Sequence, residues 1–127
     1  MPHMRQPARG VVLFVMACAP PPLAPAAHAH AYLRHAVPAV GSTLTVAPTE
    51  VECFFTEALE PSFSTLEVQD AAGKRVDAGD KHLAPQDAKE MIVGLRKLGP
   101  GAYTVIWHAV SVDTHHTQGR FTFTVAP

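Results

Sequence analysis

One carboxylate and two imidazoles lie within four consecutive residues near the end of the chain: Asp113, His115 and His116, in the stretch SVDTHHTQG. In an extended chain, residues two apart point to the same side, so Asp113 and His115 would face one way and His116 the other. A carboxylate beside an imidazole can hold a metal ion, although so short a pattern is more often a solvated turn. The other ligands of a metal site would have to come from elsewhere in the sequence.

The beginning of the chain has the features of an export signal. Arg5 and Arg9 precede an apolar run at 11–19, which is too short to cross a bilayer as a helix. The residues AHA at 27–29 have the small-x-small pattern that signal peptidase prefers. A cut after this pattern would make His30 the first residue of the mature protein.

This cut divides the chain into a cleaved signal peptide, 1–29, and one domain, 30–127. Two alternatives stay open. The residues VMAC end at Cys18 and loosely resemble a lipoprotein box, and lipidation there would anchor the protein and leave His30 without a free amine. The apolar run would otherwise be kept in the domain as a strand or short helix, although the prolines that follow leave it nothing to pack against.

A mature His30 would bind a metal through two atoms, its α-amine and its imidazole nitrogen. His115 and Asp113 would add a third nitrogen and an oxygen. This set in tetragonal geometry suits Cu(II), which also heads the affinity order of divalent ions. Zinc uses the same ligand types but prefers a tetrahedron, and magnesium and calcium would need more oxygen. An iron site of two histidines and a carboxylate would not need the amine.

The elements that must position these ligands are predicted to be β-strands, because the apolar pattern after residue 30 has period two. The alternating stretches are 49–57, 64–70, 90–95, 102–112 and 119–125. The residues LGPGAYTV around Tyr103 have the arrangement of a tyrosine corner. We predict an all-β fold: a Greek-key antiparallel β-sandwich, immunoglobulin/cupredoxin-like, of about seven strands. The polar stretch 78–89 is expected to be a loop.

Composition agrees with one globular domain. The chain has 127 residues, of which 47% are hydrophobic, and a formal net charge of −1, which excludes disorder by composition and electrostatic binding of nucleic acid. Without Cys18, Cys53 stands alone and is predicted to be a small buried residue, a copper thiolate being the alternative. Trp107 is expected in the core, His108 in the core or hydrogen-bonded, and His35 in solvent.

Three ordered motifs resemble the CopC family of periplasmic copper-resistance proteins. They are HAYLRHAVPAVGS at 30–42, FFTEALEPSFSTLEV at 54–68 and LGPGAYTVIWHAVSVDTHHTQGRFTFTV at 98–125. The likeness covers nearly all of 30–127.

The resemblance implies one Cu(II) per chain, held by His30 through its amine and imidazole and by Asp113 and His115. Glu57 falls on a family glutamate near the site, as a weak ligand or an outer hydrogen-bond partner; a solvated carboxylate is the alternative. Two features depart from the family. Many members have a histidine where this chain has Tyr32, and the methionine-rich loop that binds Cu(I) in some members is missing, so no Cu(I) site is predicted.

The sequence therefore predicts a periplasmic Cu(II)-binding protein for copper homeostasis or resistance, which passes or buffers copper and is not an enzyme. The resemblance also implies a CopD-like inner-membrane copper transporter as a partner. A lone domain with no membrane span after cleavage favours a monomer. The alternative is a copper-dependent oxidative enzyme with an N-terminal histidine site, although Asp113 would occupy the coordination position that such an enzyme leaves open. A third class is an interaction module with an incidental histidine turn.

Overall fold

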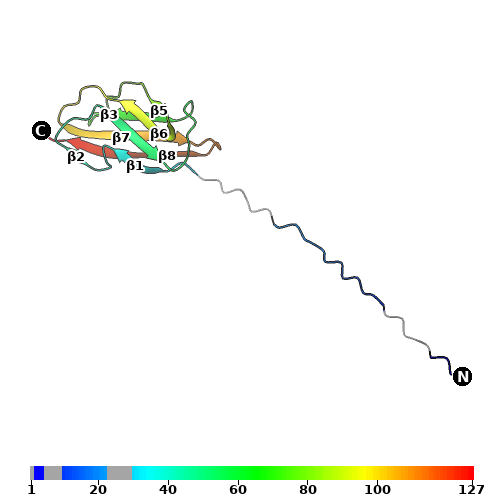
Figure 1. Cartoon of the computed structure of the whole chain (residues 1–127). Helices are drawn as coiled ribbons and strands as arrows, with labels where there is room; N and C mark the ends of the chain where they lie inside the picture. Colours follow the sequence, from blue (N-terminus) through cyan, green and yellow to red (C-terminus); the bar gives the residue numbers. More distant parts are fainter. Residues whose placement is uncertain (1, 5–9, 23–29) are drawn as a thin grey trace.

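Two four-stranded sheets face each other in the computed structural model, which describes residues 2–4, 10–22 and 30–127 (Figure 1). The strands are β1 (Leu33–Val37), β2 (Thr43–Leu44), β3 (Glu50–Phe55), β4 (Thr65–Gln69), β5 (His82–Ala84), β6 (Asp87–Gly94), β7 (Gly101–Val110) and β8 (His116–Val125). One sheet has the order β1-β3-β6-β5 and the other β2-β8-β7-β4. All pairs are antiparallel except β2 with β8. The predicted all-β sandwich is confirmed.

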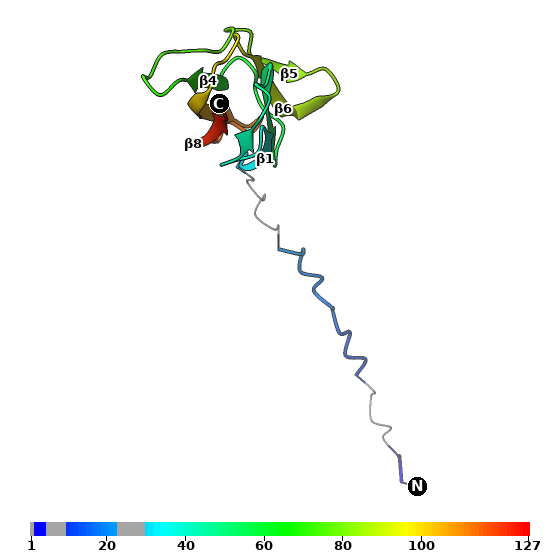
Figure 2. The ribbon, with the colours of Figure 1, turned by 90° about the vertical axis from the view of Figure 1, so that its left-hand side faces the viewer.

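The described residues before 30 lie outside this sandwich. Residues 2–4 and 10–22 form no regular secondary structure and lead away from the domain in both views (Figures 1 and 2). Every buried residue of the described chain lies between Ala31 and Val125, so this segment adds nothing to the core. No helix in the described ranges could span a membrane. The predicted cut at 27–29 falls outside the described residues.

The core is built from the predicted period-two pattern. Val51, Cys53 and Phe55 alternate along β3 and are at most 1% exposed. Burial raises the pKa of the Cys53 thiol to about 12, so the thiol stays protonated at neutral pH and the predicted buried role holds. Trp107 is buried too and meets Phe55 edge to face, with ring centroids 5.2 Å apart. Burying each such side chain stabilises the fold by roughly 1.5–3 kcal/mol.

The predicted tyrosine corner is present where the chain enters β7. The Tyr103 hydroxyl donates a hydrogen bond to the carbonyl oxygen of Gly99 at 2.6 Å. Its ring stacks on Phe123 of β8, with centroids 5.4 Å apart. The corner lies where β7 begins, and Tyr103 pairs with Phe123 in the β7–β8 hairpin that carries Asp113 and His115 at its far end.

Two local expectations are wrong. The stretch 78–89 is not a loop throughout, because it contains β5 and the start of β6, which pair as a hairpin. Only its half-buried Leu83 contacts the core, which leaves too weak a pattern to read in the sequence. His108 is exposed rather than in the core, because the buried residues Trp107 and Ala109 on either side of it take the inward positions of β7.

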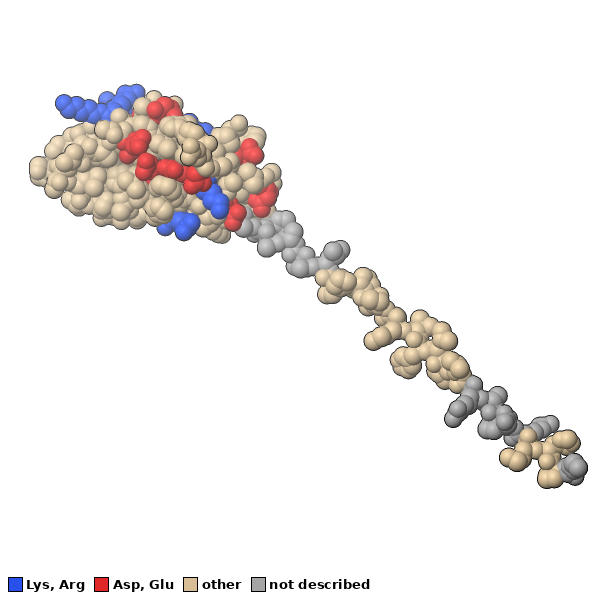
Figure 3. All heavy atoms as spheres, in the orientation of Figure 1, with Lys and Arg blue, Asp and Glu red and all other residues tan. Residues whose placement is uncertain are grey.

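Charged side chains are distributed unevenly over the surface. Figure 3 shows acidic side chains at the end of the domain where the preceding segment joins it, and across the middle of the face in view. Lys and Arg side chains lie among the acidic ones on this face. Asp113 and His115 lie at the end of the domain where the preceding segment joins it.

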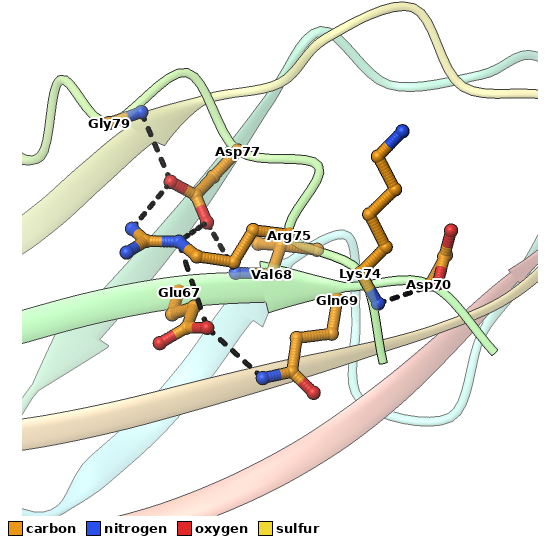
Figure 4. A network of polar contacts seen from close by, with 8 residues as sticks. All are labelled: Glu67, Val68, Gln69, Asp70, Lys74, Arg75, Asp77 and Gly79. Carbon is orange, nitrogen blue, oxygen red and sulfur yellow. Dashed lines mark hydrogen bonds and ion pairs between the residues drawn. The ribbon is translucent and has the colours of Figure 1, made fainter. Parts of the chain in front are cut away.

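A buried carboxylate fastens the segment after β4 to the sandwich (Figure 4). Asp77 is 3% exposed and accepts hydrogen bonds from Arg75 and from the backbone amides of Val68 and Gly79, at 2.9–3.1 Å. Burial by itself raises the pKa of Asp77, but the hydrogen bonds and the charge of Arg75 outweigh it and hold the pKa below its usual value. Asp77 is therefore ionised and fully paired in the folded protein.

Candidate metal centre

Hydrogen bonds to the backbone hold the residues before β1 against the start of β8 and against the residue that follows β3. The hydroxyl of Thr117 in β8 donates to the carbonyl oxygen of Ala31 at 2.5 Å, and Ala31 is fully buried. The hydroxyl of Thr56, just after β3, donates to the carbonyl of His30 at 3.0 Å and accepts from the amide of Tyr32 at 2.9 Å. The amide of Thr56 donates to the carbonyl of Tyr32 at 2.9 Å. The backbone position of His30 is thus set by its neighbours.

A tight turn joins β7 to β8 and carries the Asp-x-His motif. The amide of Ser111 donates to the carbonyl of His115 at 3.0 Å, and the amide of Thr114 donates to the carbonyl of Ser111 at 2.8 Å. Thr114 has φ of 71°, which is uncommon for a residue other than glycine. Asp113 and His115 do lie on one side, with Nδ1 of His115 3.2 Å from Oδ1 of Asp113. The turn produces this arrangement, not the extended chain that we expected.

The carboxylate of this turn is held in its charged form. The hydroxyl of Ser111 donates a short hydrogen bond to Oδ1 of Asp113. This bond first, and the hydrogen bond from His115 second, keep the pKa of Asp113 below its usual value. Asp113 therefore offers an anionic oxygen beside an imidazole at neutral pH, which is the chemistry that a divalent metal ion requires.

The imidazoles of His30 and His115 lie face to face across 85 residues of sequence. Their ring centroids are 4.5 Å apart with an interplanar angle of 25°. Tyr32 stacks on His30 as well, with centroids 5.9 Å apart and an angle of 13°. The three predicted ligands, His30, Asp113 and His115, are therefore brought together.

Their side chains are not yet arranged around one point. Among the residues that the structure describes, no three His, Cys, Asp or Glu side chains have an arrangement that could hold a metal ion. The ring orientation accounts for this. The rings of His30 and His115 are stacked rather than aimed at a common position. The backbone nitrogen of His30 is also part of a peptide bond in the uncut chain, so its lone pair is not available to a metal.

Comparison with known proteins assigns the chain to one family. A family model described as the CopC domain matches residues 33–126. The chain belongs to the CopC family. Protein YobA of Escherichia coli (strain K12) is 39% identical to it over 102 residues, which are 80% of this chain and 82% of that protein.

Solved CopC structures share the fold. CopC from Methylosinus trichosporium OB3b matches with a TM-score of 0.69 and 28% identity, over 77% of this chain and 95% of that one. PcoC, a methionine rich copper resistance protein from Escherichia coli, matches with a TM-score of 0.65 and 35% identity, over 76% and 99% of the two chains. Membership of a family that includes copper resistance proteins supports a copper-binding role.

The remaining predicted residues of this CopC protein are less closely tied to the centre. Glu57 directly follows Thr56 and is half-buried, and the described residues show no hydrogen bond or ion pair from its side chain to His30 or Asp113. Its role stays a prediction. His116 begins β8 and is exposed.

Sequence reasoning missed the hydroxyl groups that position the centre. The hydroxyl of Ser111 donates to Asp113, that of Thr56 donates to the carbonyl of His30, and that of Thr117 donates to the carbonyl of Ala31, the residue after His30. Single Ser and Thr residues near strand ends carry no pattern that separates them from other polar residues. Only the fold, which brings 30–32 to the start of β8, gives them this role.

Proposed function

We propose that this CopC protein is a periplasmic copper-binding protein which, once cut before His30, holds one Cu(II) and buffers it or passes it on. The ligands would be the amine and imidazole of His30, the imidazole of His115 and the carboxylate of Asp113. One observation carries the proposal: the ring of His30 lies 4.5 Å from that of His115, whose Nδ1 is 3.2 Å from Asp113.

Cleavage would supply the ligand that the uncut chain lacks. It would turn the peptide nitrogen of His30 into an amine, which gives three nitrogens and one oxygen, a set that suits Cu(II). The backbones on both sides are fixed by the bonds from Thr56, Thr117 and within the 111–115 turn, so only side-chain rotations would separate the stacked rings. Such rotations are rapid for partly exposed residues. Asp113, already ionised, would need no proton loss before binding.

Position at the surface would let copper enter and leave. Asp113 is exposed and His115 is partly exposed, with side chains 36% and 34% accessible. This favours a carrier or buffer over a permanently closed site. We propose that the acceptor is a CopD-like inner-membrane copper transporter, that the protein is a monomer, and that Glu57 assists as a weak ligand or outer hydrogen-bond partner.

No catalytic turnover is proposed. Four protein atoms would fill the square of a Cu(II) ion and leave no equatorial position for oxygen. The loaded protein, mixed with ascorbate, should therefore produce hydrogen peroxide no faster than the same amount of copper bound to a simple chelator. Faster production would support the oxidative-enzyme alternative instead.

The amine gives the sharpest test. Two proteins would be compared, one that begins at His30 and one that keeps the single residue Ala29 before it, with the amine of Ala29 acetylated so that the longer protein has no free N-terminal amine. Both retain every buried residue of the described core, from Ala31 to Val125. We expect Cu(II) affinity to fall in the longer protein by at least about 10- to 100-fold, since loss of an outer partner of a ligand alone costs that much.

Spectroscopy and a matched control complete this experiment. Electron paramagnetic resonance should report three nitrogens on Cu(II) in the protein that begins at His30 and fewer in the longer one. His35→Ala removes another exposed histidine, on β1, and should leave affinity unchanged. Equal affinity of the two N-terminal forms would overturn the amine ligand. An intact mass of exported protein that begins at Cys18 with a lipid would overturn the cut.

A further inference from the structure

A second pair of histidines lies on the outward face of the β7–β8 hairpin. In β7, His108 is exposed while its neighbours Trp107 and Ala109 are buried. In β8, His116 is exposed and stands five residues before the buried Phe121, and therefore on the opposite face of the strand. Both imidazoles thus leave the sheet on the side away from the core.

The strand register makes these two histidines diagonal neighbours. His108 pairs with Gln118, and Val110 pairs with His116. Gln118, the residue opposite His108, lies two positions after His116 and on the same face of the sheet. Diagonal neighbours in an antiparallel pair lie about 7–8 Å apart, within reach of long side chains. Two imidazoles that start at this separation can direct one ring nitrogen each toward a common ion.

The surface between them is hollow and uncharged. His108 and His116 line one hollow of about 550 Å³, together with Phe63, Thr65, Val110, Thr117 and Gln118. None of these residues is an acid or a base other than the histidines. Among the described residues no hydrogen bond fixes either imidazole, so both rings are able to turn into the hollow.

We propose that His108 and His116 form a second binding site for a divalent transition-metal ion. Two imidazoles without a carboxylate suit Cu(II), Zn(II) and Ni(II), and Cu(II) has the highest affinity of these. Magnesium and calcium, which need several oxygen ligands, would not bind. Water would complete the coordination, with the Thr65 hydroxyl and the Gln118 amide at hand as hydrogen-bond partners.

This site stands independently of the proposed function, because it uses none of the ligands His30, Asp113 and His115. It has two protein ligands where the first centre would have four ligand atoms, so it would bind copper more weakly and fill second. It lies beside the first centre, because His116 adjoins His115 and Thr117 of the same hollow holds Ala31. A protein with both sites would carry two metal ions of unequal affinity.

The test uses the protein that begins at His30, with His30→Ala and Asp113→Ala introduced to disable the first centre. Cu(II) alone is the probe, and Zn(II) is titrated in parallel. We expect one weakly bound Cu(II), with paramagnetic broadening of the imidazole resonances of His108 and His116. Adding His108→Ala or His116→Ala should each weaken this binding by about tenfold or more, no less than the loss of an outer partner costs at other metal sites.

His82→Ala is the matched control, because His82 is an exposed histidine on β5 of the other sheet. It should leave the weak binding unchanged, and thermal unfolding should be the same for all these surface variants. The proposal is overturned if either His108→Ala or His116→Ala has no effect, since binding would then need only one histidine, or if His82→Ala has the same effect. Failure of the proposed function would show separately, as absence of the tighter site in the protein with His30 and Asp113 intact.

Discussion

Replacement of Thr117 by valine should release the segment that carries His30. The Thr117 hydroxyl is the hydrogen-bond donor to the carbonyl of Ala31, at 2.5 Å, and Ala31 is 0% exposed. Valine has nearly the same shape but cannot donate, so the carbonyl would be buried without this partner. A buried polar group left in this way costs about 1–3 kcal/mol. Docking of the segment should therefore weaken by about 5- to 150-fold.

Hydrogen exchange measures this docking without any copper. The amide of Thr56 donates to the carbonyl of Tyr32 at 2.9 Å, so it exchanges when the segment leaves. Its protection factor should fall in Thr117→Val by the factor given above, while amides in the middle of β7 stay protected. Cu(II) affinity should fall as well, by at most the same factor, because only the docked fraction brings His30 to His115.

Thr122→Val is the control for this prediction. Thr122 lies on the same strand, is exposed, and has no side-chain hydrogen bond among those described. It should change neither exchange at Thr56 nor copper affinity. If Thr117→Val keeps full protection of the Thr56 amide, the bond to Ala31 does not hold the segment. If protection falls but copper affinity does not, the segment does not supply a ligand.

Three further predictions concern the sandwich itself. Gly119→Ala should destabilise the protein by about 1–3 kcal/mol, because the added Cβ would lie 2.6 Å from a ring carbon of Trp107. Gly99→Ala, whose Cβ would meet nothing within 4 Å, should be near neutral. Urea unfolding followed by tryptophan fluorescence measures both variants, and equal effects would contradict the prediction. Folding lowers the pKa of Asp77, so its ionised form stabilises the protein fully above the unfolded pKa of about 3.9, and this stability is lost as pH falls through the lower folded pKa. The urea midpoint of the unmutated protein should therefore drop more steeply on acidification than that of Asp77→Asn. Parallel curves for the two proteins would refute this. Burial raises the pKa of the Cys53 thiol to about 12. In the protein that begins at His30, which lacks the exposed Cys18, a thiol reagent at neutral pH should therefore react only after unfolding, and prompt reaction of the folded protein would contradict this.

Strands β3, β4, β6, β7 and β8 could be predicted from the sequence, whereas the very short edge strands β2 and β5 could not. In β3 the buried residues Val51, Cys53 and Phe55 alternate with more exposed ones, and this pattern is visible in the letters alone. Strand β2 has two residues and β5 has three, which is too short for any period to repeat. Such strands form because a neighbouring strand has unpaired backbone N–H and C=O groups beside them. Whether these groups are present depends on the fold rather than on the local sequence.

The residues of the candidate site could be selected from the sequence, but the groups that support them could not. The side chains of these residues are of types that bind metal ions, so residue type alone was enough to select His30, Asp113 and His115. Their closeness depends on the pairing of β7 with β8 and on the hydroxyls of Thr56 and Thr117, which act across many residues of chain. We expected an extended chain to place Asp113 and His115 on one side. The two side chains do lie on one side, but a turn in which Thr114 has a positive φ places them there.

The bond from Thr117 to Ala31 spans 86 positions, so the two halves of the candidate centre meet only when the last strand has joined its sheet. Contacts between such distant residues raise the contact order and tend to form late in folding. A chain still being exported, or one that lacks β8, would therefore capture no copper at this centre. Conversely, a copper ion whose free concentration is 100 times its dissociation constant would stabilise the completed sandwich by about 2.7 kcal/mol. Copper would act as a selective stabiliser of molecules that have finished folding, and metal content would report how much of the exported protein is correctly assembled.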